Sequence, residues 1–83
     1  MYIDPRHLVQ LSLIVEAGSF QAAADRIGIT QPALSRNMKT LEDRAGIALF
    51  DRSSRKAEPT DLGLKLAQAG ISIRTAEEQA RNL

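Results

Sequence analysis

The chain contains no cysteine and no tryptophan, and His7 is its only histidine. Without cysteine there can be no disulfide and no thiolate-bound metal, and one histidine cannot build an imidazole metal site. We therefore expect neither a metal nor a cofactor.

Long apolar runs are also missing, since no stretch approaches the roughly 18 residues that a membrane helix needs. The N-terminus, MYIDPRHL, has an acid and a proline where a signal peptide has a basic start and an apolar run. We expect a cytoplasmic protein that does not bind membranes.

The 83 residues have room for one small domain. Hydrophobic residues make up 43% of the chain and charged residues 25%, which is typical of a globular protein and too apolar for a disordered one. A domain this small buries only about 60% of the surface that its unfolded chain exposes, so its stability is marginal. With disulfides and metals excluded, a second chain is the stabilising partner we expect.

The net charge is only +1, but the charges are unevenly distributed. Residues 30–56 carry six basic and three acidic side chains, whereas residues 1–29 carry two basic and three acidic ones. A local basic patch suits contact with a polyanion, although most charge runs are simply solvated surface.

Capping residues and glycines predict three short helices, a hairpin and a long helix. The first helix begins at Pro5 after Asp4 and ends at Gly18; the second follows Ser19 and ends at Gly28; the third follows Thr30 and runs to about Ala45, before Gly46. Residues 47–52 and 57–59 predict the two strands of a hairpin, and Thr60 caps a last helix that continues toward Leu83.

The second and third helices are joined by a very short turn. Ala24, Gly28 and Leu34 have the spacing of a helix-turn-helix, in which the alanine permits close helix approach and the glycine allows the sharp turn. Any three-helix bundle with a tight corner is the alternative interpretation.

The third helix has two distinct faces. Leu34, Met38, Leu41 and Ala45 fall within one narrow arc at 100° per residue and predict the core side. The opposite face carries Pro32, Ser35, Arg36 and Lys39, with Gln31 at its start. Arginine can bond guanine and glutamine can bond adenine in bidentate fashion, so this face is a candidate base reader. A solvated face paired to local acids is the alternative.

The predicted hairpin turn is basic as well. Arg52, Arg55 and Lys56 surround Ser53 and Ser54, and such a wing can reach a DNA backbone or minor groove. An exposed turn that only aids solubility is the alternative.

The segment AGSFQAAADRIGITQPALSRNMKTLEDRAGIALFDR, followed by PTDLG, resembles the N-terminal DNA-binding domain of LysR-type transcriptional regulators. The resemblance implies a winged helix-turn-helix, a dimerising linker helix and a bacterial transcription factor. It places Gln31, Pro32, Ser35 and Arg36 at bases; Ser19, Thr30 and Lys39 near phosphates; and Arg52 or Arg55 near the minor groove. Asn37 and the segment 57–59 depart from the family pattern.

The last helix carries a heptad seam formed by Leu62, Leu66, Ala69, Ile73, Ala76, Ala80 and Leu83. This seam predicts pairing with the linker helix of a second copy, and the resemblance favours an antiparallel pair; a higher oligomer of a full-length protein is left open. The alternative is that the first half of the helix packs on its own domain through Leu62, Leu64, Leu66 and Ile71.

We thus expect a mainly α fold: a winged helix-turn-helix of three helices and a two-stranded wing over 1–59, followed by a linker helix over 60–83. No effector-binding domain or small-molecule site is expected in this segment. The predicted function is sequence-specific binding of double-stranded DNA by a homodimer on an interrupted inverted repeat, at the bacterial nucleoid. A helical protein-interaction module with a basic face for an acidic partner is the alternative. Catalysis is not expected, because His7 and the adjacent Glu42 and Asp43 do not form a base and nucleophile pair.

Overall fold

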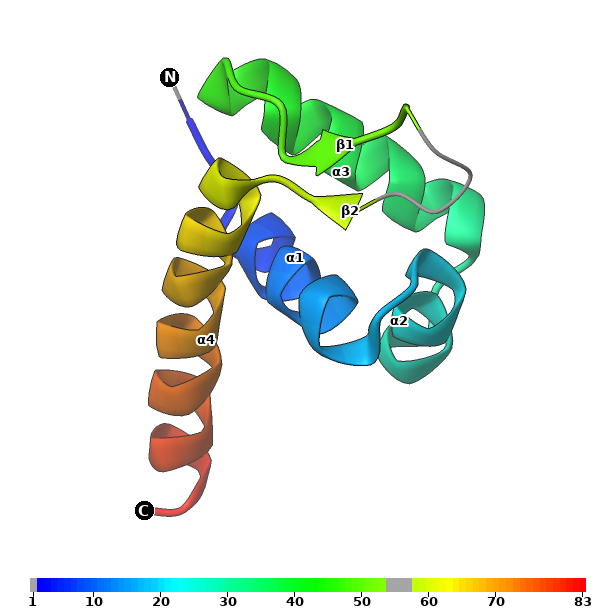
Figure 1. The fold of residues 1–83 in the computed structure, drawn as a ribbon. Coiled ribbons are helices and arrows are strands. Elements are labelled where there is room, and N and C mark those ends of the chain that lie inside the picture. Colours follow the sequence, from blue (N-terminus) through cyan, green and yellow to red (C-terminus); the bar gives the residue numbers. More distant parts are fainter. Residues whose placement is uncertain (1, 54–57) are drawn as a thin grey trace.

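Four helices and a two-stranded sheet make up the chain. The computed structural model describes residues 2–53 and 58–83. The elements follow in the order α1 (Pro5–Ala17), α2 (Phe20–Ile27), α3 (Gln31–Ala45), β1 (Phe50–Asp51), β2 (Glu58–Pro59) and α4 (Asp61–Arg81) (Figure 1). The fold is a winged helix-turn-helix with a long C-terminal helix, so the predicted fold class is confirmed.

Each helix begins where the sequence predicts, because a side-chain oxygen accepts an otherwise unpaired backbone N–H at its start. The capping residues are Asp4, Ser19, Thr30 and Thr60. The first three helices each end at a glycine with positive φ, namely Gly18, Gly28 and Gly46. These glycines adopt the left-handed conformation that other residues avoid, which turns the chain sharply after each helix.

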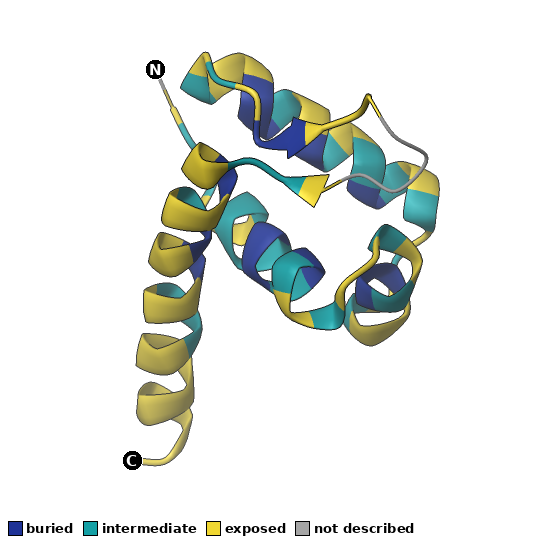
Figure 2. Cartoon of the chain, in the orientation of Figure 1, coloured by how far each residue is buried: buried dark blue, intermediate teal, exposed yellow. Residues whose placement is uncertain are grey.

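The core lies where α1, α2 and α3 meet the start of the wing and of α4 (Figure 2). Its members are almost wholly inaccessible to solvent: Leu11, Ile14, Ala23, Ala24, Leu34, Met38, Leu41, Leu49, Phe50 and Ala67. The small side chains of α2 let that helix approach its neighbours closely, as the alanine-rich sequence predicts.

The wing begins as a minimal antiparallel ladder. Phe50 pairs with Pro59 and Asp51 with Glu58. The ladder is extended by the backbone N–H of Thr60, which donates to the Leu49 carbonyl at 2.9 Å. Proline is tolerated in β2 because the sheet has only two strands and Pro59 needs no second partner.

The N-terminal part of α4 packs along α1, and its contact face consists of Gly63, Ala67 and Gly70, which are all buried. A Cβ at Gly63 would overlap the Leu49 carbonyl, and one at Gly70 would overlap the Leu8 carbonyl, so glycine is required for this close approach.

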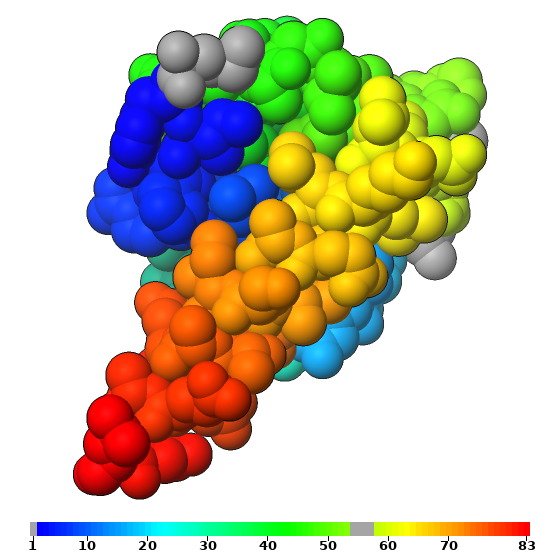
Figure 3. Space-filling view, turned by 90° about the vertical axis from the view of Figure 1, so that its left-hand side faces the viewer, coloured from blue at the N-terminus to red at the C-terminus, as the bar shows by residue number. Residues whose placement is uncertain are grey.

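The interpretation that α4 packs on its own domain through large side chains is wrong: Leu62, Leu64 and Ile71 are 48%, 42% and 43% exposed, and only Leu66 is half-buried. Small residues win because they let two helix backbones meet. Farther along, the last turns of α4 project beyond the body of the domain (Figure 3). Within the described part of the chain, no helix is long and apolar enough to span a bilayer.

A carboxylate on α1 links α4 to the helix-turn-helix. Glu16 Oε2 accepts hydrogen bonds from Arg74 Nη2 of α4 and from Arg26 Nη2 of α2, each at 3.1 Å. The charge of Arg74, with a further contribution from Arg26, lowers the pKa of Glu16. Glu16 therefore connects three helices at one point on the surface.

Candidate nucleic-acid interface

The turn between α2 and α3 is short and well ordered by hydrogen bonds. The backbone N–H groups of Gly28 and Ile29 both donate to the Ala24 carbonyl, at 2.9 and 3.1 Å. Thr30 then caps α3 by accepting from the Ala33 N–H at 3.2 Å. This geometry fixes the angle between the two helices and leaves the first turn of α3 at the surface.

The two faces of α3 are those that the sequence predicts. Leu34, Met38 and Leu41 are buried against α1 and α2. On the outer side, Pro32, Arg36 and Lys39 are exposed, while Gln31 and Ser35 are half-buried. The five side chains predicted from the sequence are thus present together along the outer face of one helix.

Two of these side chains contact each other. Gln31 Nε2 donates a hydrogen bond to Ser35 Oγ at 3.1 Å. The amide of Gln31 keeps its oxygen and one N–H available, which are the donor and acceptor that an adenine edge requires. The pair therefore presents an oriented amide at the start of α3.

The cations of α3 differ in how they are paired. Arg36 has no ion-pair partner among the residues that the structure describes. Lys39 Nζ lies 3.3 Å from Asp43 Oδ1, but both side chains are well exposed, so a phosphate can compete with this pair at little cost.

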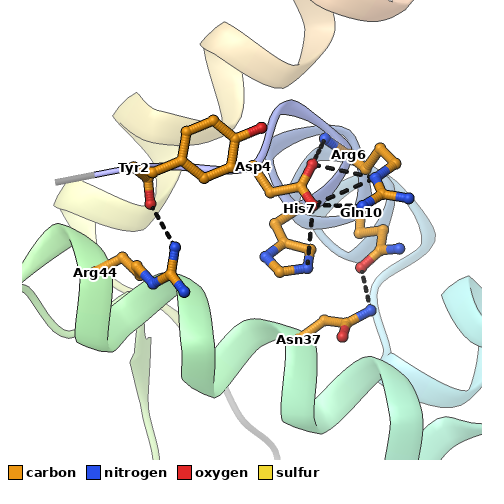
Figure 4. Close-up of polar contacts among 7 residues, drawn as sticks. All are labelled: Tyr2, Asp4, Arg6, His7, Gln10, Asn37 and Arg44. Carbon is orange, nitrogen blue, oxygen red and sulfur yellow. Dashed lines mark hydrogen bonds and ion pairs between the residues drawn. The ribbon is translucent and has the colours of Figure 1, made fainter.

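The opposite side of α3 is tied to α1 and to the N-terminal segment (Figure 4). Asn37 Nδ2 donates to Gln10 Oε1 of α1 at 3.0 Å, and Arg44 Nη1 donates to the carbonyl of Tyr2 at 3.1 Å. Sequence analysis missed both contacts, because neither polar pair has a recognisable spacing. They fix the rotation of α3 about its axis, which decides which side chains face outward.

The N-terminal cap of α1 forms a second polar cluster in the same view. Asp4 accepts from the backbone and the guanidinium of Arg6, the shortest side-chain contact being 2.8 Å, and lies 3.9 Å from His7 Nε2 (Figure 4). Hydrogen bonds from the Arg6 side chain and then from its backbone N–H lower the pKa of Asp4 to about 2. This cluster caps a helix and has no nucleophile beside it.

Two candidate phosphate contacts lie at helix starts. The hydroxyls of Ser19 and Thr30 accept from the N–H groups of Ala22 and Ala33, at 3.1 and 3.2 Å. Each hydroxyl keeps its own proton, and each stands at the positive end of a helix dipole, where an anion is favoured.

The wing cations are only partly described. Arg52 does not extend freely into solvent, because its Nη1 bonds Glu42 Oε1 at 2.9 Å and its guanidinium lies 5.7 Å from the Phe50 ring centroid. Sequence analysis treated Glu42 as a surface acid that repels DNA, but it is buried. Its place beside the apolar arc of α3 was the only signal of that burial. Arg55 and Lys56, the other predicted wing contacts, lie outside the described residues.

The heptad seam of α4 flanks a groove of about 240 Å³ on the side of α1. Pro5, Val9, Leu13, Ile27 and Ile73 give this groove an apolar lining. The remaining seam positions are half-buried at Leu66 and exposed at Leu62, Ala69, Ala76, Ala80 and Leu83.

Comparison with known proteins identifies the family. Residues 5–64 match the model of the bacterial regulatory helix-turn-helix proteins of the lysR family. A probable RuBisCO transcriptional regulator of Gracilaria tenuistipitata var. liui is 42% identical over 88% of this chain and 24% of its own length. The transcriptional regulator BenM of Acinetobacter baylyi is 39% identical over 93% of this chain and 25% of its own length.

Among solved structures, the BenM DNA-binding domain in complex with catB site 1 DNA has a TM-score of 0.84 and 36% identity, covering 96% of this chain and 90% of that one. The chain spans only about a quarter of the length of the two curated relatives. The match covers the helix-turn-helix, the wing root and the start of α4. This chain belongs to the LysR family of bacterial helix-turn-helix regulators, and its fold is that of their DNA-binding domains.

Proposed function

We propose that this chain binds double-stranded DNA in a sequence-specific manner, with α3 in the major groove. Gln31, Pro32, Ser35 and Arg36 would contact bases, while Ser19, Thr30 and Lys39 would contact phosphates. The observation that carries the proposal is the outer face of α3, where an oriented amide and an unpaired guanidinium stand within the first two turns. The complex of the related BenM domain with DNA supports the same assignment.

The two ends of α3 differ in a way that favours entry by the N-terminal end. The N-terminal half carries hydrogen-bonding and cationic side chains, whereas exposed Asp43 lies in the C-terminal half. A helix N-terminus also attracts phosphate through its free N–H groups and dipole. Base contacts are therefore expected before residue 40.

Selection of bound sequences from a random duplex library tests this function. Arg36→Ala should lower affinity for the selected site by about 1–3 kcal/mol and relax the preference at one position. Lys39→Ala should weaken all sequences alike. Arg81→Ala, at the far end of α4, removes the same charge away from the interface and should leave the selected motif unchanged. A uniform loss of affinity in Arg36→Ala, with an unaltered motif, would refute base reading.

We further propose that the chain forms a homodimer through α4, so that its site is an interrupted inverted repeat. The seam of α4 is an apolar heptad stripe without a partner in the chain, and the groove beside it is apolar. The buried stripe of Gly63, Ala67 and Gly70 is already used against α1, which leaves the seam for a second copy.

Sedimentation equilibrium tests the dimer with two adjacent substitutions. Ala76→Asp places a charge in the seam and should yield monomers, because an unpaired charge is costly at an apolar interface. Thr75→Asp introduces the same charge on an exposed position outside the seam and should leave the dimer intact. A wild-type chain that is monomeric at high micromolar concentration, with a concentration-independent melting temperature, would contradict the proposal.

This proposal assigns no catalytic activity to the chain. Asp4 and His7 cap α1, and the Glu42 carboxylate is occupied by backbone and guanidinium donors. DNA binding of this kind would place the protein in the cytoplasm, at the nucleoid.

A further inference from the structure

The most deeply buried charge that DNA reading leaves unexplained is Glu42, in the last turn of α3. Its side chain is 9% exposed, and its carboxylate gathers three donors from the segment that leads into the wing. Oε2 accepts from the N–H groups of Leu49 and Phe50, at 2.8 and 3.4 Å, and Arg52 Nη1 lies 2.9 and 3.2 Å from the two carboxylate oxygens.

These contacts continue through the aromatic rings at the base of the wing. The Arg52 guanidinium lies over Phe50, and the Phe50 ring meets the Phe20 ring of α2 at a centroid distance of 4.9 Å and a tilt of 56°. Phe50 also pairs with Pro59 across the sheet. One connected set of contacts thus joins the reading helix, both strands of the wing and the first helix of the helix-turn-helix.

We propose that Glu42 and Arg52 are positioning residues that set where the wing stands relative to α3, and that Arg52 acts through Glu42 rather than as a phosphate contact. This inference rests on the proposed DNA binding. With α3 seated in a major groove, the base of the wing is then held at a fixed offset along the duplex, and the flanking backbone is met at a fixed distance from the bases that α3 reads.

The chemistry of the pair supports this role. A carboxylate that accepts two backbone N–H groups has little freedom to move, and a guanidinium bonded to both of its oxygens is directed by it. Arg52 remains half exposed, at 50%, but its charge is already balanced at short range. A cation that is neutralised in the free protein releases no DNA counterion when it binds, whereas a cation that newly meets a phosphate does.

Binding of the full chain to its selected duplex separates positioning from direct contact. The variants are Glu42→Gln, which removes the charge and keeps the shape, Arg52→Ala, and the double variant. Hydroxyl-radical footprints report the flank and the centre of the site separately, and the slope of log affinity against log salt counts the phosphates neutralised. Because Arg52 is half exposed, Arg52→Ala tests the proposal even if Glu42→Gln is too unstable to study.

We expect both single variants to lose protection at the same flanking positions and to keep the central protection. The double variant should lose no more than either single one, and all three should retain the wild-type salt slope. A slope lowered by about one in Arg52→Ala but not in Glu42→Gln would show a direct phosphate contact and overturn the proposal. Unchanged flanking protection in both single variants would overturn it too.

A measurement without DNA keeps this test apart from that of DNA binding itself. Hydrogen exchange at the Leu49 and Phe50 amides should quicken in both single variants, because their acceptor is weakened or loosened. Unaltered exchange at both amides would refute the anchoring of the wing. Failure of the wild-type chain to bind any duplex would instead refute the proposed function and leave the exchange result standing.

Discussion

Substitution of Gly70 by alanine tests the close packing of α4 on α1. A Cβ at this position would overlap the Leu8 carbonyl oxygen and lie 2.7 Å from the Leu8 carbonyl carbon and 3.0 Å from Ser12 Cβ. The obstructing atoms belong largely to helix backbone and cannot rotate away. An ordinary C···O contact is about 3.3 Å, so α4 would have to retreat by roughly an ångström.

Two opposing effects decide the magnitude. Alanine is favoured over glycine inside a helix by about 1 kcal/mol, which would stabilise the variant if there were space. A gap of 0.5–1 Å, however, forfeits about a quarter to a half of the dispersion energy at each contact along the interface, and overpacking typically costs about 1–3 kcal/mol. Because the obstruction here is backbone, we expect the steric cost to prevail, with a net loss of about 1–2 kcal/mol.

Thermal denaturation followed by circular dichroism measures this loss. For a domain of this size, 1 kcal/mol corresponds to a shift of about 4–8 °C in the melting temperature. Ser72→Ala, on an exposed position of the same helix, is the matched control and should raise the melting temperature slightly. Each protein should be measured at several concentrations, because dimerisation also affects melting. A Gly70→Ala variant that melts at or above the wild type would refute the argument.

Three further predictions concern charge and base reading. The pKa of Asp4 is lowered to about 2, below the unfolded value near 3.9, so its contribution to stability is complete above about pH 4 and is lost as the pH falls through 2. Asp4→Asn keeps a cap and should flatten that part of the acid profile in urea titrations; a profile parallel to that of the wild type would contradict this. Gln31→Ala and Ser35→Ala should relax preference at the same base pair, and their double variant should cost less than the sum, measured on single-base-substituted duplexes; strict additivity would show independent contacts. Arg44→Ala should leave the salt slope of DNA binding unchanged, because its guanidinium bonds the Tyr2 carbonyl; a slope lower by about one would place it on a phosphate.

The helix boundaries could be predicted from the sequence because the signals that set them are local. Ser19 and Thr30 each accept an N–H three residues ahead, and Gly28 and Gly46 each end a helix with a positive φ. Nothing distant in the chain competes with such contacts. The outer face of α3 was predictable for a similar reason, since the apolar arc on one side leaves only one other side for the polar residues.

The packing of α4 could not be predicted in the same way. Two stripes on this helix have the same heptad period, one of large residues and one that contains Gly63, Ala67 and Gly70. Hydrophobicity favours the first stripe for the interior, but the decision depends on how closely α1 can approach, which is a tertiary property. The role of Glu42 was hidden for the same reason, because its partners at Leu49 and Arg52 lie beyond a turn.

The basic charge of residues 30–56 represents several different kinds of cation once the chain is folded. Arg44 and Arg52 are held by partners within the protein, at the Tyr2 carbonyl and the Glu42 carboxylate. Lys39 has an exposed partner that a phosphate can replace, and Arg36 has none among the described residues. A count of basic residues therefore overstates the number of phosphates that this face can neutralise. The affinity of the domain for DNA should depend more on the few oriented groups at the start of α3 than on the net charge of the segment.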